Sequence, residues 1–502
     1  MADTVLFDGA PDWRAIAAIA RGARLGLSPA AEERIRHARS LVDSLVASGT
    51  RGYGINTGVG ALCDVVIDRD RQAQLSRNIL LSHSCGVGAP LGREETRAIM
   101  AAQIANFAHG CSGVRPETVA ALVALLNADI LPVIPSRGSV GYLTHAAAIG
   151  LVLIGEGQAR IGDRIVSGAQ AMAELGLAPL VLAAKEGLSL VNGTPCATGL
   201  AALALARMER MLGWADAAAA VSYENLGAQN AAFDAVPLGL RKSDGLAASG
   251  ANLRAWLADS EILAKGAGRR TQDPLSLRAV PQVHGAVRDA FCEAVRVTDR
   301  ELASVTDNPA VTGTPAAPEV WSQAHAVGAG MALALDGLAT AAATLAAISE
   351  RRTDRLVNPL VSGLPAFLAA GGGVYSGFMI LQYTAASLVA ENRRFAAPAT
   401  LDGGITSALQ EDILTHATPA AGKLLQILDN LELVLAIELL AAMQAYDMQP
   451  DPAARRAPAT DRLYRFIRAL LPAYRDDRPL NADLALLRAR IADRDLSGPE
   501  ML

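Results

Sequence analysis

Aromatic side chains are scarce in this chain, and cysteine is scarcer. Only 4% of the 502 residues are Phe, Trp or Tyr, and the five cysteines show no CxxC or Cys/His ligand spacing. Such cysteines are typical of reduced thiols and not of disulfides or zinc ligands. Residues Met1 to Thr4 carry neither a basic stretch nor the apolar run of a secretion signal. We therefore expect a cytoplasmic protein without a metal centre.

A strong charge of either sign is also missing. The formal net charge is −5, so the composition gives no reason to expect a nucleic-acid partner. No stretch is a convincing membrane span, because the most apolar candidate, residues 331–349, contains Asp336 and runs into Glu350, Arg351 and Arg352. We expect that stretch to be a buried helix and the partner to be a small molecule.

Alanine, leucine and valine dominate the composition of the chain. The chain is 51% hydrophobic with a mean hydropathy of +0.26, and strand-like alternation is rare. This composition predicts a mainly helical protein, and the apolar surplus predicts large subunit interfaces. From Pro450 the sequence becomes rich in Pro, Arg and Asp. We expect an N-terminal domain with the active-site loops over residues 1–200, a central helical bundle over 201–450 and a helical edge over 451–502.

One glycine-rich segment organises the rest of the chain. Residues 136–157 read SRGSVGYLTHAAAIGLVLIGEG, a turn-prone opening followed by an apolar stretch of helical character. Glycines in front of a helix let the backbone approach a ligand closely and point unpaired N–H groups at it. The segment therefore predicts a ligand site at the start of a helix.

Two further segments carry side chains capable of chemistry. Residues 51–60 contain four glycines around Tyr53, which predicts a mobile loop, and His83 lies in residues 78–88. Taken alone, Tyr53 could be a surface aromatic residue and His83 a hydrogen-bonded structural residue. A functional role for Tyr53 and His83 is inferred only when these segments are considered together with others in the chain.

That set resembles the histidine and aromatic amino-acid ammonia-lyases, over roughly residues 30 to 490. The resemblance implies a mainly helical fold with a long central bundle and a smaller, loop-rich N-terminal part. It also implies a homotetramer whose active sites draw residues from three subunits. The matching segments are YGINTGVG with the family's Y-G-V-N-T-G-F-G, SHSCGVG with S-H-A-x-G-V-G, KEGLSLVNGT with K-E-G-L-A-L-L-N-G-T, QDPLSLRAVPQ with Q-D-P-Y-S-L-R-x-x-P-Q, and QED at 410–412 with N-Q-E-D.

The resemblance implies a role for each matching side chain. Tyr53 corresponds to the catalytic base, Arg278 to the arginine that clamps the substrate carboxylate, and Glu411 to a catalytic glutamate near the imidazole. A planar guanidinium suits such a carboxylate, because it can pair with both oxygens. His83 corresponds to the residue that faces the substrate side chain, and Asn192 to one beside the amine. The other substrate-binding candidates are Gln272, which matches the family, His325 and Tyr375, which each replace an asparagine, Lys185, and Tyr142.

The chain departs from the family where the family reads G-S-V-G-A-S-G-D-L. There, Ala-Ser-Gly cyclises into a methylidene-imidazolone electrophile, which activates the amine as a leaving group. Here Gly141 is followed directly by Tyr142, and the distance to residues 151–157 is three residues short. Ala-Ser-Gly does occur at 47–49 and at 248–250, but without the family's flanking residues. We therefore expect no cofactor.

A quaternary amine would make that electrophile unnecessary. A trimethylammonium group leaves as neutral trimethylamine, and aromatic faces such as Tyr142 and Tyr375 could hold such a cation. Our hypothesis is a lyase that eliminates trimethylamine from a histidine betaine, ergothioneine or hercynine, with Tyr53 as the base. In this the chain resembles ergothionase, a relative of the family.

Three alternatives stay open at this point. The chain is an ordinary histidine or aromatic amino-acid ammonia-lyase if a matured group is missing from the written sequence. It could instead catalyse another elimination or addition without the electrophile. A third possibility is a catalytically silent homologue that binds a small ligand.

Overall fold

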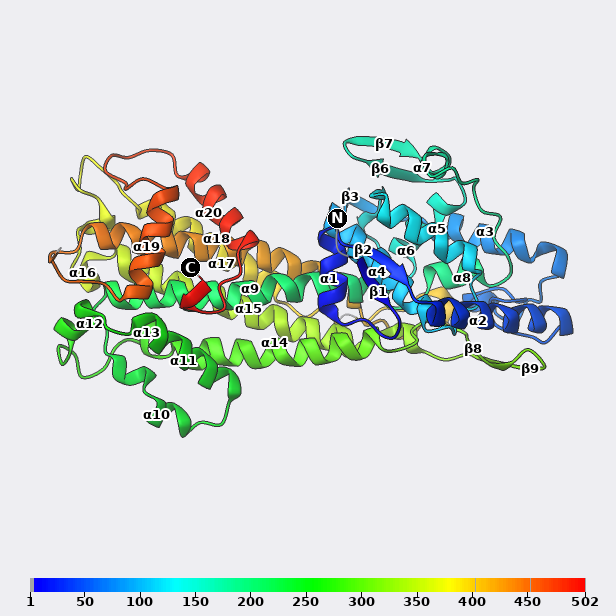
Figure 1. Cartoon of the computed structure of the whole chain (residues 1–502), viewed down its shortest axis with the longest axis horizontal. Helices are drawn as coiled ribbons and strands as arrows, with labels where there is room; N and C mark the ends of the chain where they lie inside the picture. Colours follow the sequence, from blue (N-terminus) through cyan, green and yellow to red (C-terminus); the bar gives the residue numbers. More distant parts are fainter. Residues whose placement is uncertain (1–3, 402, 452, 502) are drawn as a thin grey trace. The chain divides into compact units, whose positions relative to one another are not determined.

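The computed structural model describes residues 4–401, 403–451 and 453–501, and these are mainly helical (Figure 1). This confirms the predicted fold class. Residues 1–3, on which the expected lack of a secretion signal partly rests, lie outside the described residues. The chain forms two compact units: unit 1 is Met1–Ala206, Ala294–Asp336 and Pro398–Gly422, and unit 2 is Arg207–Glu293, Gly337–Ala397 and Lys423–Leu502. The domain boundaries predicted at 200 and 450 stay a prediction.

Unit 1 combines helices with small sheets. β1 pairs in parallel with β2, whereas the pairs β3–β5, β4–β6, β6–β7 and β8–β9 are antiparallel. Figure 1 shows β6 and β7 as a hairpin beside α7. The helices are α1 (Trp13–Arg21), α2 (Pro29–Ser48), α3 (Gln72–His83), α4 (Arg93–Ala108), α5 (Pro116–Asn127), α6 (Thr144–Leu153), α7 (Gly168–Glu174) and α8 (Glu186–Val191). The strands are β1 (Thr4–Phe7), β2 (Arg24–Leu27), β3 (Val87–Pro90), β4 (Ile130–Pro132), β5 (Pro135–Arg137), β6 (Gln158–Ile161), β7 (Arg164–Ser167), β8 (Ala310–Thr314) and β9 (Ala317–Trp321). The 3₁₀ helices are η1 (Gly60–Leu62), η2 (Arg69–Arg71), η4 (His325–Val327) and η6 (Ser407–Leu409).

Helix α2 shows how the sequence sets the borders of an element. The Ser28 side chain accepts a hydrogen bond from the Ala31 amide, and Pro29 occupies the first turn, where no intrahelical donor is needed. The helix ends at Gly49, which adopts the left-handed conformation that a glycine tolerates best. One face of α2 buries Leu41 in a cluster with the loop residue Ile55. The loop that carries Tyr53 is thereby anchored to the core of unit 1.

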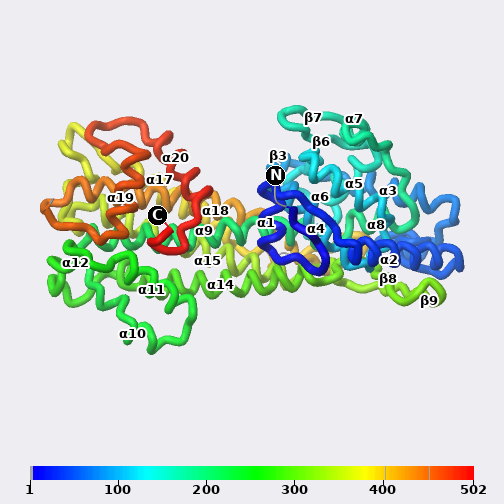
Figure 2. Tube along the Cα trace, in the orientation of Figure 1, coloured from blue at the N-terminus to red at the C-terminus, as the bar shows by residue number. Residues whose placement is uncertain are grey.

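In the part of the chain that the structure describes, four long helices have residues in both units: α9 (Pro195–Asn225), α14 (Val280–Leu302), α15 (Ala329–Val357) and α18 (Ala417–Asp447). Unit 2 further contains α10 (Ala235–Gly239), α11 (Asp244–Leu257), α12 (Glu261–Gly266), α13 (Leu275–Arg278), α16 (Pro359–Ser362), α17 (Met379–Phe395), α19 (Pro458–Leu470) and α20 (Asn481–Asp493), with 3₁₀ helices η3 (Asn230–Phe233), η5 (Ala366–Leu368) and η7 (Pro499–Met501). In the Cα trace (Figure 2), the green α11 and the orange α19 lie side by side.

A buried ionic network ties the unit 2 parts of three long helices together. The Glu438 carboxylate of α18 accepts hydrogen bonds from Ser222 of α9 and from Ser349 and Arg352 of α15, at 2.5–2.8 Å. Both members of the Arg352–Glu438 pair are fully buried. Removing one partner would leave an uncompensated charge in the core, so the network fixes which helix faces meet.

Within the described residues, two helical stretches are long and apolar enough to cross a membrane by length and composition alone. The most apolar window of Glu186–Asn225 is completely buried inside the fold, and that of His325–Val357 is half buried. The second stretch includes residues 331–349, for which the sequence predicts a buried helix.

Candidate active site

Tyr142 and Glu411 meet in unit 1, although they are far apart in the sequence. The Tyr142 hydroxyl donates a 3.0 Å hydrogen bond to Glu411 Oε2. Burial and the Glu411 carboxylate together raise the pKa of Tyr142 well above its ordinary value. Tyr142 is therefore a permanent hydrogen-bond donor at neutral pH, and it holds one oxygen of Glu411 in place.

Tyr53 lies in the glycine-rich loop between α2 and η1. Gly54 has φ +60°, and a Cβ built on it would lie 2.2 Å from Leu188 Cδ2, so the loop needs glycine there. The Tyr53 hydroxyl oxygen accepts a 2.9 Å hydrogen bond from the Gly60 amide. Burial and then the Glu411 charge raise the pKa of Tyr53, while the Gly60 amide opposes this shift. An amide that donates to the phenol oxygen favours the phenolate, which is the form that can act as a base.

His83 is the last residue of α3, and its ring Nδ1 lies 3.0 Å from Ser82 Oγ. Burial lowers the pKa of the His83 imidazole, and the Ile79 carbonyl and the Glu411 carboxylate partly oppose this. The Glu411 charge thus acts on Tyr53, Tyr142 and His83 alike. The structure brings these four predicted residues together in one place. A phenol, a carboxylate and an uncharged imidazole are groups that can move a proton and bind a polar ring.

The turn before α6 holds Tyr142 in position. Thr418 Oγ1 of α18 donates a 2.9 Å hydrogen bond to the Gly141 carbonyl, and the Leu143 amide donates a 2.9 Å bond to the Val191 carbonyl. Leu143 adopts φ +74°, a left-handed conformation that costs a side-chain-bearing residue about 1–3 kcal/mol. The surrounding bonds must offset this cost. Tyr142 is therefore fixed between the starts of α6 and α18 and the end of α8.

Asn192 follows α8 directly, next to the residue that binds the Leu143 amide. Its side-chain amide donates 2.8 Å to the Asn308 carbonyl, and its Oδ1 accepts 2.9 Å from the Gly193 amide. Asn192 thus lies beside the Tyr142 turn, and its role near the amine stays a prediction. Its known hydrogen bonds stabilise the local chain.

Lys185 is buried in an ion pair. Its ammonium donates to the Ser112 carbonyl, Ser189 Oγ and Asp307 Oδ2 at 2.7–2.9 Å, so all three N–H bonds are used inside unit 1. Burial lowers the pKa of Lys185, and the Asp307 carboxylate opposes this. The geometry assigns Lys185 a place in the core of unit 1.

His325 is the first residue of η4, and its contacts lie elsewhere in unit 1. Its ring Nδ1 lies 3.0 Å from the Val305 carbonyl, and its amide donates 2.6 Å to Gln323 Oε1. The charge of His325 also acts on Glu301, whose pKa is raised by burial. Its predicted contact with the imidazole of a substrate stays a prediction.

Three predicted residues belong to unit 2. Arg278 ends α13, and within the described part of the chain its buried Nε has no hydrogen-bond partner. Such a donor is costly when left alone, and a carboxylate would satisfy it. Gln272 is exposed on the preceding loop. A hydrogen bond to the Asp476 carboxylate raises the pKa of Tyr375, so that hydroxyl already has a partner.

His416 is not among the residues predicted from the sequence, yet it borders the site. It adopts φ +55°, its amide donates 3.0 Å to the Val140 carbonyl, and its buried Nε2 has no hydrogen-bond partner among the described residues. Strained residues with unsatisfied polar atoms gather at functional sites. The one indication in the sequence is its place five residues after Glu411.

A family model described as "Aromatic amino acid lyase" matches residues 12–469. The histidine ammonia-lyase of Deinococcus radiodurans is 44% identical over 487 residues, which cover 96% of this chain and 92% of that protein. The crystal structure of histidine ammonia-lyase from Trypanosoma cruzi aligns with a TM-score of 0.89 and 35% identity, over 97% and 94% of the two chains. The ergothioneine-degrading enzyme ergothionase from Treponema denticola aligns with a TM-score of 0.91 and 28% identity, over 100% of both chains.

These comparisons overturn the predicted elimination of trimethylamine. Relatives from Deinococcus radiodurans and Symbiobacterium thermophilum, each 44% identical over 96% of this chain, are histidine ammonia-lyases. The likeness to ergothionase is weaker in sequence, at 28% identity. The ordinary ammonia-lyase, which the sequence left open as an alternative, fits the relatives better than the betaine hypothesis does.

The expectation of no cofactor is also contradicted by these relatives, because the histidine ammonia-lyases carry the methylidene-imidazolone group. The residues after Gly141 do not themselves fit that group. Tyr142 and Leu143 stand where Ala-Ser would begin the cyclisation, and Leu143 has no hydroxyl to lose. The other Ala-Ser-Gly tripeptides lie at the end of α2 and inside α11, and in α11 Ser249 Oγ accepts a hydrogen bond from Arg288.

The family itself is established by the match. The family model matches residues 12–469, and the relative from Deinococcus radiodurans covers 96% of the chain. The aligned crystal structure of the Trypanosoma cruzi enzyme shares the helical fold. The predicted carbon–nitrogen lyase is thereby confirmed. The chain belongs to the aromatic amino acid lyase family, among the relatives of histidine ammonia-lyase.

Proposed function

We propose that this protein is a histidine ammonia-lyase, which breaks the Cα–N bond of L-histidine and releases ammonia and an imidazolyl acrylate. The 44% identity to histidine ammonia-lyases over 96% of the chain carries this proposal. The Glu411 charge acts on both Tyr53 and His83, which supports the proposal because these groups suit an imidazole side chain.

The side chains divide the work as follows. Tyr53, as the phenolate, removes a proton from Cβ, and the electrons of that C–H bond form the Cα–Cβ double bond. The Cα–N bond breaks, and the nitrogen of the substrate ammonium group takes its electron pair and leaves as neutral ammonia. His83 and Glu411 bind the imidazole ring. The buried Nε of Arg278 in unit 2, which lacks a hydrogen-bond partner among the described residues, suits the carboxylate of a substrate. Asn192 is assigned to the amine, and its position beside the Tyr142 turn supports this.

Incubation of the purified full-length protein with L-histidine, L-phenylalanine and ergothioneine in parallel tests this proposal. We expect the near-ultraviolet absorbance of urocanate and release of ammonia from L-histidine only. Inert L-histidine, or trimethylamine from ergothioneine, would overturn it. A Tyr53→Phe variant, which keeps the ring and loses the hydroxyl, shows that the turnover belongs to this protein and not to a contaminant.

We further propose a cytoplasmic homotetramer. The five cysteines are all free, as is usual in a reducing compartment. Large apolar side chains are exposed on both units, with Leu360 at 90% and Val374 at 86% in unit 2 and Leu401 at 80% in unit 1. Apolar side chains that are this exposed in one chain can be buried against another subunit. Light scattering coupled to size-exclusion chromatography tests this, and a mass of one chain would contradict it.

A further inference from the structure

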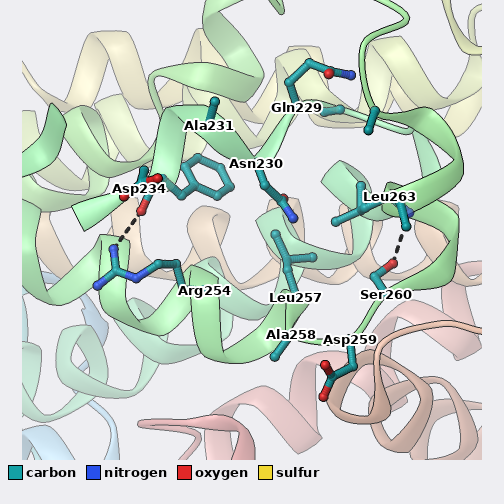
Figure 3. A pocket seen from close by; sticks show the side chains of 14 residues that line it. Gln229, Asn230, Ala231, Asp234, Arg254, Leu257, Ala258, Asp259, Ser260 and Leu263 are labelled. Carbon is teal, nitrogen blue, oxygen red and sulfur yellow. Dashed lines mark hydrogen bonds between the residues drawn. The ribbon is translucent and has the colours of Figure 1, made fainter. Parts of the chain in front are cut away.

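Unit 2 holds a cavity of about 500 Å³, built by residues 228–234 together with the end of α11 and α12 (Figure 3). That volume lies within the range of small-molecule sites. All lining residues come from the Arg207–Glu293 segment of unit 2. The cavity is thus separate from the cluster around Glu411 in unit 1.

The lining combines an apolar floor with polar groups at the edges. Figure 3 shows the Asn230 amide between Leu257 and Leu263, with Arg254 and Asp259 farther out. The Arg254 guanidinium donates a 2.6 Å hydrogen bond to the Phe233 carbonyl. The exposed Asp259 carboxylate, in contrast, has no hydrogen bond or ion pair to any described residue.

The charges of the lining disfavour an anion. Asp234 and Asp259 give two negative charges, and Arg254 gives one positive charge that is already engaged with a carbonyl. An amine or other organic cation could place its charge near Asp259, its apolar body against Leu257 and Leu263, and a polar atom against Asn230. An uncharged apolar molecule would use the floor and leave the carboxylates unmatched.

Gln229 connects the cavity wall to the next loop. Its Nε2 donates 3.0 Å to the Gly266 carbonyl, its Oε1 accepts 2.8 Å from the Gly268 amide, and its own amide donates 2.5 Å to Asp273 Oδ2. Three hydrogen bonds from one residue therefore hold residues 266–273. That loop carries Gln272 and leads into α13, which ends at Arg278.

We propose that this cavity binds a small organic cation with an apolar body, and that its occupancy rigidifies residues 266–273 through Gln229. A rigid loop would hold Gln272 and Arg278 in place for the substrate, and this consequence rests on the proposed function. Binding itself and the change in the loop do not depend on turnover.

Titration calorimetry with 2-phenylethylamine tests the binding, with 2-phenylethanol and 3-phenylpropionate as the uncharged and anionic probes of similar shape. We expect the amine to bind more tightly than the alcohol and the acid to bind least. Asp259→Asn should weaken amine binding about 2- to 5-fold, as expected for an exposed ion pair, and leave the alcohol unaffected. Asp163→Asn, an exposed carboxylate of unit 1 outside the cavity, is the matched control and should change nothing.

A second variant keeps the test decisive. Ala264 lines the cavity and is exposed, so Ala264→Trp fills the space without burying a new group in the core. It should abolish binding of the amine and the alcohol. Failure of 2-phenylethylamine to bind the wild type, or equal binding to Ala264→Trp, would overturn the proposal.

Hydrogen exchange of the whole chain tests the connection to the loop. Saturating 2-phenylethylamine should slow exchange in residues 266–273 in the wild type, and much less in Gln229→Ala. Unchanged exchange in the wild type would overturn the rigidification even if the amine binds. Inert L-histidine would overturn the proposed function and leave both of these results standing.

Discussion

The Tyr142 hydroxyl donates a 3.0 Å hydrogen bond to Glu411 Oε2 across 269 positions of sequence. The same carboxylate contributes to the raised pKa of Tyr53 and opposes the lowering of the pKa of His83. One charge therefore links side chains from the 51–60 loop, from α3 and from the turn before α6. A substitution that removes the Glu411 charge should therefore change the pKa of Tyr53, His83 and Tyr142.

Glu411→Gln should shift the pH dependence of turnover. The carboxylate disfavours a nearby phenolate, so its removal lowers the pKa of Tyr53. Because the base is the phenolate, the rate rises with pH, and this rise should occur at lower pH in the variant. The measurement is kcat/KM for L-histidine from about pH 6 to about pH 11. Asp412→Asn, which changes the exposed neighbour of Glu411, is the control. If kcat/KM of Glu411→Gln rises at the same pH as that of the wild type, the electrostatic link is wrong.

Tyr53→Phe should lower kcat by about 10²- to 10⁴-fold, the usual contribution of a general base. The ring remains, and only the hydroxyl that accepts from the Gly60 amide is lost. Tm should therefore change little. Tyr383→Phe serves as the control, because Tyr383 is 61% exposed on α17. Retained turnover in Tyr53→Phe with an intact fold would exclude Tyr53 as the base.

His83→Phe should reduce kcat/KM for L-histidine relative to L-phenylalanine. The variant removes one of the two polar partners proposed for the substrate imidazole, which costs about 1–3 kcal/mol, or about 5- to 150-fold. Competition between the two amino acids measures the ratio directly. An unchanged ratio would show that His83 does not contact the substrate side chain.

The sequence could predict much of this site and not all of it. Tyr53, His83 and Glu411 lie in short segments whose residues identify them, and the structure brings them together. The hydrogen bond between Tyr142 and Glu411 could not be predicted, since no local pattern connects residues so far apart. His416 could not be predicted for another reason. It stands out by its left-handed backbone and by its Nε2, which has no partner among the described residues, and both are properties of the folded chain alone.

Composition predicted the helical fold but not the role of its buried charges. Lys185 lies in a family motif and was expected near the substrate, yet its ammonium is used up by Ser112, Ser189 and Asp307. A lysine in a sequence does not reveal whether an acidic partner lies behind it in the core. The partner here is 122 positions away.

Lys185→Met should destabilise the protein by about 3–5 kcal/mol, because it leaves the Asp307 carboxylate buried without its partner. The double variant Lys185→Met/Asp307→Leu removes both charges and should recover most of that loss. Thermal unfolding of the wild type, both single variants and the double variant gives the comparison. Equal losses in the single and double variants would show that packing and not charge sets the cost.

Glu186→Gln should change how stability depends on pH. Burial alone would raise the pKa of Glu186, but hydrogen bonds from Arg115, Ala183 and Thr118 bring it below its ordinary value. A carboxyl group whose pKa is lowered on folding adds stability that is complete above the unfolded pKa of about 4.3 and is lost as the pH falls through the lower folded pKa. The variant should therefore be less stable by about 1.5–3 kcal/mol near neutral pH.

That deficit should shrink as the pH falls below about 4, because the wild-type carboxylate then becomes protonated too. Tm of the wild type and Glu186→Gln from about pH 3 to about pH 8 measures it. Glu117→Gln, an exposed residue of the first turn of α5, is the matched control and should follow the wild type throughout. A deficit that is the same at pH 3 as at pH 7 would mean that Glu186 acts through its shape and neutral hydrogen bonds, and not through the charge that Arg115 holds in the core.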